Sequence, residues 1–156
     1  MIKGKGFTLI ELLVTLALIS LFATLALPLA ELTVKRSQEA ELRAALRQIR
    51  EALDRHKQMA DDGRITLRLG DSGYPPTLEI LVEGVIDNKS PDRQKIYFLR
   101  RLPRDPFADP SQKTDGGWGW RSYKSPFDRP RAGDDVYDVY SLSGGVGLNG
   151  VPYREW

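Results

Sequence analysis

Residues 12–30 form a run of nineteen apolar or small side chains without a single charge. A helix of this length and composition is long enough to cross the hydrocarbon core of a bilayer. Lys3 and Lys5 precede the run, and the positive-inside rule places such an N-terminus in the cytoplasm and the following chain outside. We therefore expect a single-pass membrane protein whose larger part lies beyond the membrane.

Glu11 stands at the entrance to this apolar run. A charged group at the edge of a membrane segment costs free energy and is usually retained for a partner. An ordinary secretory signal carries its small-residue cleavage site after the apolar stretch, whereas here the small residue, Gly6, comes before it. In a plain signal anchor, Glu11 would have no role and would lie at the membrane interface only by chance. Neither a secretory signal nor a plain signal anchor therefore explains the positions of both Gly6 and Glu11.

The segment Gly6-Phe7-Thr8-Leu9-Ile10-Glu11 resembles the processing and assembly signature of type IV pilins and type II secretion pseudopilins. In these proteins a prepilin peptidase cuts after the glycine, the new N-terminal Phe is methylated, and the Glu guides assembly. The resemblance implies cleavage between Gly6 and Phe7, N-methylation of Phe7, and filament assembly through Glu11 and Phe7. Pro28 lies where many members of the family carry a proline that bends the helix.

The helical pattern continues beyond residue 30 but becomes amphipathic. Apolar positions recur at steps of three and four, namely Leu42, Ala45, Leu46, Ile49, Ala52, Leu53 and His56. Charged residues are expected on the other faces, namely Glu39, Glu41, Arg43, Arg47, Arg50, Glu51 and Arg55. Because no Gly or Pro interrupts residues 29–60, we predict one helix over residues 7–60, bent near Pro28.

The predicted organisation has four parts: a cleaved leader (1–6), a transmembrane or filament-core helix (7–30), an amphipathic continuation (31–62) and a periplasmic globular region (63–156).

Turn and strand signals fill the globular region. Gly63 suits the end of the long helix, and Thr77 suits the N-cap of a brief helix over residues 78–83, stopped by Gly84. Aromatic and β-branched residues alternate in 118–123 and 136–142, which predicts two strands. The expected fold class is α+β and pilin-like, with the long helix packed on a small antiparallel sheet of about three strands.

The globular part extends the resemblance. Four segments follow the order found in the major (G-type) pseudopilins of type II secretion: Tyr74-Pro75-Pro76-Thr77, then Leu99 with Pro103-Arg104-Asp105-Pro106-Phe107, then Trp118-Gly119-Trp120-Arg121-Ser122-Tyr123, then Tyr137-Asp138-Val139-Tyr140-Ser141. This implies a pseudopilus subunit that polymerises from the bacterial inner membrane to drive export of folded proteins. The implied partners are copies of itself, minor pseudopilins, the prepilin peptidase and the inner-membrane assembly platform.

The last loop departs from the family pattern. Pseudopilins of this type usually carry acidic residues there and bind calcium, but residues 142–150 contain no carboxylate, and the next is Glu155. Calcium needs six to eight oxygens, normally including several carboxylates. Asp134 and Asp135 are interpreted as a solvated turn, and Asp138 falls within a strand. We therefore expect no cofactor and no metal, with Trp156 packing over the loop instead.

Enzyme and nucleic-acid functions find no support in the sequence. His56, the only histidine, lies on the apolar side of a helix, where packing explains it, and no Gly-x-Ser-x-Gly elbow is present. The Gly-rich stretch 143–150 lacks the Lys-Ser/Thr of a phosphate loop. Without Lys3 and Lys5 the charges balance at 21 basic and 21 acidic residues, so no basic surface for nucleic acid is expected. We predict no catalytic residues.

Two other functions stay open. The first is a type IV pilin of a surface or competence pilus, although such pilins often carry a disulfide loop that a chain without Cys cannot make. The second is a membrane-anchored binding module that never polymerises and recognises a ligand through its strand aromatics, Trp118, Trp120, Tyr137 and Tyr140.

Overall fold

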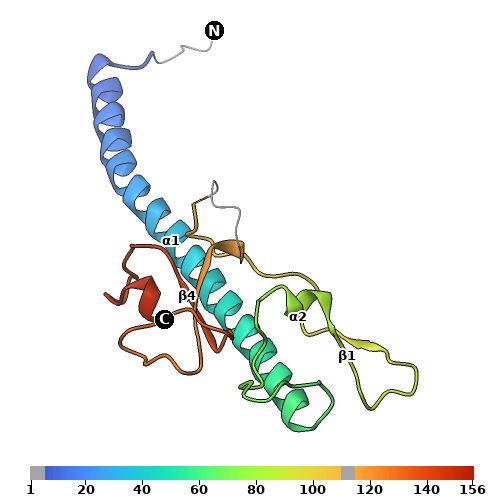
Figure 1. Cartoon of the computed structure of the whole chain (residues 1–156). Coiled ribbons are helices and arrows are strands. Elements are labelled where there is room, and N and C mark those ends of the chain that lie inside the picture. Colours follow the sequence, from blue (N-terminus) through green and yellow to red (C-terminus); the bar gives the residue numbers. More distant parts are fainter. Residues whose placement is uncertain (1–5, 110–114) are drawn as a thin grey trace. The chain divides into compact units, whose positions relative to one another are not determined.

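The computed structural model describes residues 6–109 and 115–156 (Figure 1). Lys3 and Lys5 of the predicted leader lie outside the described residues. The chain divides into two compact units, Met1–Ser37 and Gln38–Trp156. A single helix, α1 (Leu9–Asp61), contributes to both of them.

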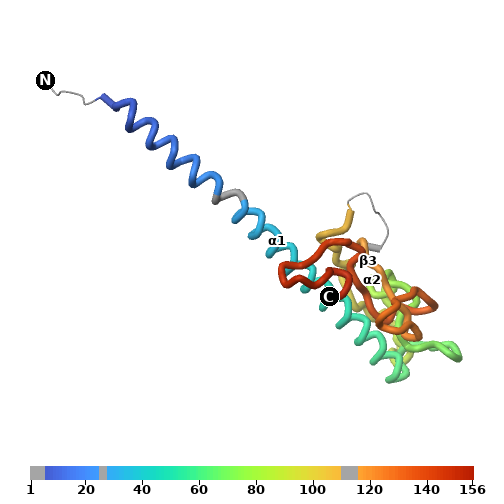
Figure 2. Tube along the Cα trace, turned by 90° about the vertical axis from the view of Figure 1, so that its left-hand side faces the viewer, coloured from blue at the N-terminus to red at the C-terminus, as the bar shows by residue number. Residues whose placement is uncertain are grey.

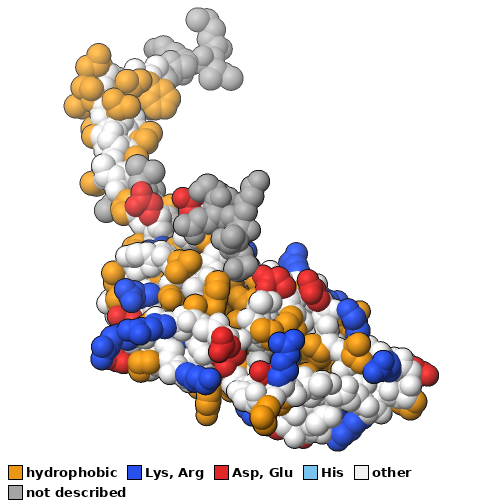
Figure 3. Space-filling view, viewed as in Figure 1, with side chains coloured by type: hydrophobic (Ala, Val, Ile, Leu, Met, Phe, Trp, Pro, Cys, Tyr) orange, Lys and Arg blue, Asp and Glu red, His pale blue; other side chains and the backbone are white. Residues whose placement is uncertain are grey.

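In the first unit, residues 12–30 of α1 carry no charged side chain on any face of the helix. Its large hydrophobic side chains are exposed, and Figure 3 shows hydrophobic groups along the surface of this unit. A helix that is hydrophobic on every face requires apolar surroundings. Among the described residues, α1 alone is long and apolar enough to cross a membrane. This confirms the predicted apolar N-terminal helix.

The C-terminal end of α1 follows the prediction closely. The helix ends at Asp61, and Gly63 adopts a left-handed backbone with φ of 71°. The amide of Arg64 donates to the carbonyl of Met59 at 2.9 Å, and the amide of Gly63 donates to the carbonyl of Ala60 at 3.0 Å. These bonds satisfy carbonyls that the helix itself leaves free, and glycine adopts the required φ without steric cost.

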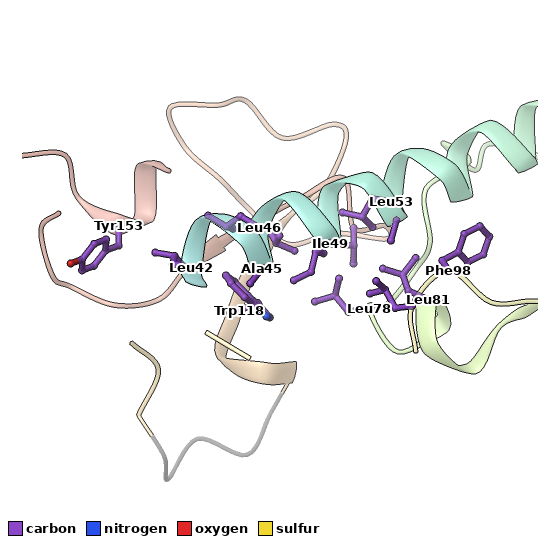
Figure 4. Close-up of a cluster of buried hydrophobic side chains, with 14 residues drawn as sticks. Leu42, Ala45, Leu46, Ile49, Leu53, Leu78, Leu81, Phe98, Trp118 and Tyr153 are labelled. Atoms are coloured by element: carbon purple, nitrogen blue, oxygen red, sulfur yellow. The ribbon is translucent and has the colours of Figure 1, made fainter. Parts of the chain in front are cut away.

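In the second unit, one face of α1 forms the centre of the core. The predicted apolar stripe is buried, and Figure 4 shows Leu46, Ile49 and Leu53 beside side chains from other segments. The core is completed mainly by Leu78, Leu81, Phe98, Leu99, Trp118, Val136, Val139 and Tyr153. Figure 2 shows these later segments gathered along one side of residues 38–61. The amphipathic prediction for this part of the helix is confirmed.

The short helix α2 (Ile80–Glu83) begins later than predicted. Its N-cap is Glu79 without a side-chain cap, and Thr77 does not fill that position. The amide of Leu81 donates to Leu78 three residues back, so the preceding turn is tighter than an α-helix. Gly84, with φ of 76°, ends α2 as expected.

The β-structure confirms the α+β class but differs in its arrangement. The predicted strand pair appears as β3 (Trp118–Arg121) and β4 (Asp138–Ser141), antiparallel, with Trp118 opposite Ser141. A second antiparallel pair, β1 (Val85–Ile86) and β2 (Lys95–Ile96), was not predicted. The described residues therefore form two two-stranded sheets instead of one sheet of about three strands. Strands of two residues are too short to show an alternating sequence pattern.

His56 lies in the core, as predicted. It is 3% exposed, its Nδ1 lies 2.9 Å from the carbonyl oxygen of Gly73, and its ring centroid is 5.3 Å from that of Phe98. Burial lowers the pKa of His56 below its usual range, and the bond to Gly73 only partly opposes this effect.

Folding stability should therefore decrease as the pH falls from about 7.5 to about 5.5. The unfolded imidazole takes up a proton near pH 6.5, whereas the folded one resists protonation, so stability is lost on the acid side, by at most about 1.4 kcal/mol per pH unit. In thermal unfolding followed by circular dichroism, His56→Gln should show a flatter dependence in this window. Equal slopes for the two proteins would contradict this explanation.

Candidate functional site

The predicted cleavage bond lies in an open, non-helical stretch. Gly6, Phe7 and Thr8 precede α1, and Phe7 is 86% exposed. A methyl group placed on Gly6 would meet nothing within 4 Å. Exposed segments outside helices are the usual sites of proteolysis. Because the chain itself has room for a side chain at position 6, any requirement for glycine there has to come from the protease.

Thr8 and Glu11 form a capping box at the start of α1. The amide and hydroxyl of Thr8 donate to Glu11 Oε2 at 2.9 and 2.8 Å, and the Glu11 amide donates to Thr8 Oγ1 at 3.3 Å. This reciprocal arrangement satisfies amide groups at the helix start that have no partner within the helix. It also explains why α1 begins at Leu9 and not at residue 7. The Thr-x-x-Glu spacing is the sequence signal that could have revealed Thr8.

Glu11 has hydrogen-bond donors but no cation within reach in the part of the chain that the structure describes. Its partner Thr8 is neutral, and none of the salt bridges between described residues includes Glu11. The carboxylate is thus oriented by Thr8, and no described residue compensates its negative charge. An acidic group in the first turn is favoured by the helix dipole.

Hydroxyl groups along the apolar part of α1 are satisfied by its own backbone. Each donates to a carbonyl three or four residues earlier: Thr15 to Leu12, Ser20 to Leu16, Thr24 to Leu21 and Thr33 to Leu29, at 2.7–2.9 Å. In a medium without water, an unsatisfied hydroxyl would cost several kcal/mol. These bonds allow the small polar residues to sit on the outside of an apolar helix.

Pro28 lies inside α1, which runs on to Asp61. Proline has no amide hydrogen, so the carbonyl of residue 24 loses its normal helical donor. The bend predicted at this position stays a prediction.

Two carboxylates that precede the C-terminal loop, those of Asp135 and Asp138, are occupied by protein partners. Asp135 was predicted in a solvated turn, but it is buried and accepts bonds from the Ser72 hydroxyl and from the Tyr123 amide. Asp138 lies in β4, as predicted, and pairs with Arg50 at 2.8 Å and with Arg121 at 3.4 Å.

No group of three potential metal-binding side chains occurs within residues 6–109 and 115–156. The donor set does not fit the calcium ion that the family resemblance implied.

Comparison with known proteins gives two matches. Residues 1–27 match the prokaryotic N-terminal methylation motif. Over 137 residues the chain is 30% identical to type II secretion system core protein G of Pseudomonas aeruginosa, covering 85% of each chain. No solved structure matches the chain.

Proposed function

The chain belongs to the family of type II secretion system core protein G, and we propose that it polymerises into a pseudopilus that drives export of folded proteins. The family assignment makes it a pseudopilin with a structural role, not an enzyme. The observation that carries the proposal is the combination of the N-terminal methylation motif with a likeness that extends over the globular unit. The name of this relative refers to secretion, which favours this role over a surface or competence pilus.

Maturation is the first proposed step. A prepilin peptidase cuts between Gly6 and Phe7, and the new amine of Phe7 is methylated. The open stretch before α1 supports this step because no helix has to unwind to expose the bond. The first unit of the mature chain stays in the inner membrane with its N-terminus cytoplasmic, and the globular unit lies in the periplasm.

Assembly is the second step. The amine of Phe7, released by cleavage, is the positive group that Glu11 of a neighbouring subunit lacks. An unpaired charge in apolar surroundings costs several kcal/mol, so pairing stabilises the docked state strongly. Only one axial stagger brings the amine and carboxylate together, and this fixes the step between subunits. Thr8 supports this role because it holds the Glu11 carboxylate at the start of the helix.

The apolar faces of α1 then pack side by side in the core of the filament. Small residues on this helix, such as Ala17, Ser20 and Ala23, allow close approach of neighbouring helices. Minor pseudopilins and the inner-membrane assembly platform are the other proposed partners. In a binding module that never polymerises, this apolar helix would serve only as a membrane anchor, whereas in a pseudopilin it also packs against neighbouring subunits.

Substitution of Gly6 tests the maturation step. Gly6→Ala should leave an unprocessed precursor that migrates more slowly on a denaturing gel, because the added methyl affects only the fit to the peptidase. Mass spectrometry of the wild-type protein should place the N-terminus at a methylated Phe7. A mature chain beginning at another residue would contradict the proposal, since its amine would be displaced from Glu11.

A further inference from the structure

The C-terminal loop, residues 142–152, joins β4 to the short helix η2 (Tyr153–Glu155). Four of its eleven residues are glycine. Its backbone closes on itself: the Gly147 amide donates to the Val151 carbonyl and the Gly150 amide donates to the Gly147 carbonyl, both at 2.9 Å, and Val146 forms a β-bridge with Pro152. Glycine loses more conformational freedom on ordering than other residues. A loop of this composition therefore needs support from outside itself.

The loop's polar side chains are engaged locally. Asn149 Oδ1 accepts the Val151 amide at 3.1 Å, and Ser143 Oγ accepts the Gly145 amide at 3.2 Å. No carboxylate occurs in residues 142–152. Among residues 6–109 and 115–156, the carboxylate that hydrogen-bonds to the loop comes from α1 and accepts the Leu148 amide.

That carboxylate is Glu39, which was predicted on a charged face but is only 4% exposed. Its Oε1 accepts the Leu148 amide at 2.7 Å and the Tyr153 hydroxyl at 3.1 Å. The Arg43 guanidinium lies 3.8 Å from Oε2. A buried carboxylate is tolerated only with such partners. Burial, together with Glu39, raises the pKa of Tyr153, so at neutral pH its hydroxyl keeps the proton that it donates.

We propose that Glu39 takes the place of a calcium ion in this protein, holding the C-terminal loop on α1 through its own hydrogen bonds. An ion would gather oxygens of the loop around a positive charge. Glu39 is an anion instead, and it accepts hydrogen bonds from an amide and a hydroxyl. The groups that face it are therefore donors, whereas a cation would require oxygen acceptors. The loop is therefore built to receive an anion from α1 and is ordered without metal.

Trp156 holds the other side of the loop. Its Nε1 donates to the Val151 carbonyl at 3.2 Å, and its ring lies against Gly147, where a methyl would approach Cζ2 to 2.4 Å. The Arg43 guanidinium lies 4.3 Å from the centroid of the same ring. Arg43 thus contacts both Glu39 and Trp156, which joins the two attachments into one cluster.

Calcium dependence of the wild-type protein is the first test. The full chain in detergent is unfolded thermally in about 10 mM calcium chloride, roughly tenfold above the upper end of known dissociation constants, or in excess EGTA. We expect midpoints that agree within about 1 °C, whereas even a weak site in about tenfold excess of calcium over its Kd would raise the midpoint by several degrees. A midpoint that EGTA lowers or calcium raises by such an amount would overturn the proposal.

Substitution of Glu39 is the second test. Glu39→Ala should lower the midpoint by roughly 5 °C or more and speed hydrogen exchange in residues 143–150 by about tenfold or more. Glu41→Ala, on an exposed position of the same helix, should change the midpoint by less than about 1 °C and leave exchange unchanged. Glu39→Gln keeps an acceptor oxygen and should restore most of the protection. Equal exchange in the two alanine variants would contradict the role of Glu39.

Discussion

Glu11→Ala is expected to abolish filament formation while the protein still inserts into the membrane. Insertion depends on the apolar run of residues 12–30, which the substitution leaves unchanged. Assembly, as proposed, depends on the charge of Glu11 meeting the amine of Phe7, and alanine leaves that amine without a partner. Electron microscopy of filaments sheared from cells that overproduce the protein measures assembly, and membrane fractionation measures insertion.

A second substitution separates the charge of Glu11 from its capping role. Glu11→Gln keeps an oxygen that can accept from Thr8 but carries no charge. If the charge is required, Glu11→Gln should fail as completely as Glu11→Ala, whereas a capping role alone would let it assemble. Glu31→Ala, at an exposed acidic position on the same helix, is the matched control and should form normal filaments. Normal filaments from Glu11→Ala would remove the proposed assembly mechanism.

The features predicted correctly from the sequence depend on neighbours along the chain. Apolar residues recur at helical spacing along the whole of the amphipathic part of α1, and the glycine that follows its end, Gly63, is a local signal for helix termination. The cleavage and assembly residues stay predictions, but they lie within six consecutive positions, 6–11, so their pattern can be recognised without any tertiary structure. Thr8 was overlooked although its spacing to Glu11 is equally local.

The features that were missed depend on contacts distant in sequence. Glu39 accepts a hydrogen bond from the amide of Leu148, which lies 109 positions later in the sequence. Asp135 accepts a hydrogen bond from the hydroxyl of Ser72, which lies 63 positions earlier. The charge of each carboxylate by itself favours a solvated position. Burial of these carboxylates is compensated by hydrogen-bond donors that lie far away in the sequence. Position 39 does precede Leu42 and Leu46 at steps of three and four, so its place on the buried stripe was present in the pattern.

Trp118→Ala should have the largest effect on stability. Trp118 opens β3, is 1% exposed, and donates from Nε1 to the Pro103 carbonyl at 2.8 Å. Replacing a buried tryptophan by alanine costs about 3–5 kcal/mol, a large part of the roughly 5–15 kcal/mol that stabilises a typical domain. We expect the thermal midpoint of the globular unit to fall by roughly 10 °C or more.

The effect should be confined to the globular unit. Near-ultraviolet circular dichroism of the full chain in detergent follows packing in residues 38–156, whereas the helical signal of the apolar run should persist above the new midpoint. Phe127→Ala, which removes an aromatic ring that is 79% exposed, is the control and should change stability by no more than about 0.5 kcal/mol. Trp118 joins β3 to the turn before it, and the opposite residue Ser141 donates to Asp105 at 2.5 Å. Equal midpoints for Trp118→Ala and Phe127→Ala would mean that this junction does not hold the core together.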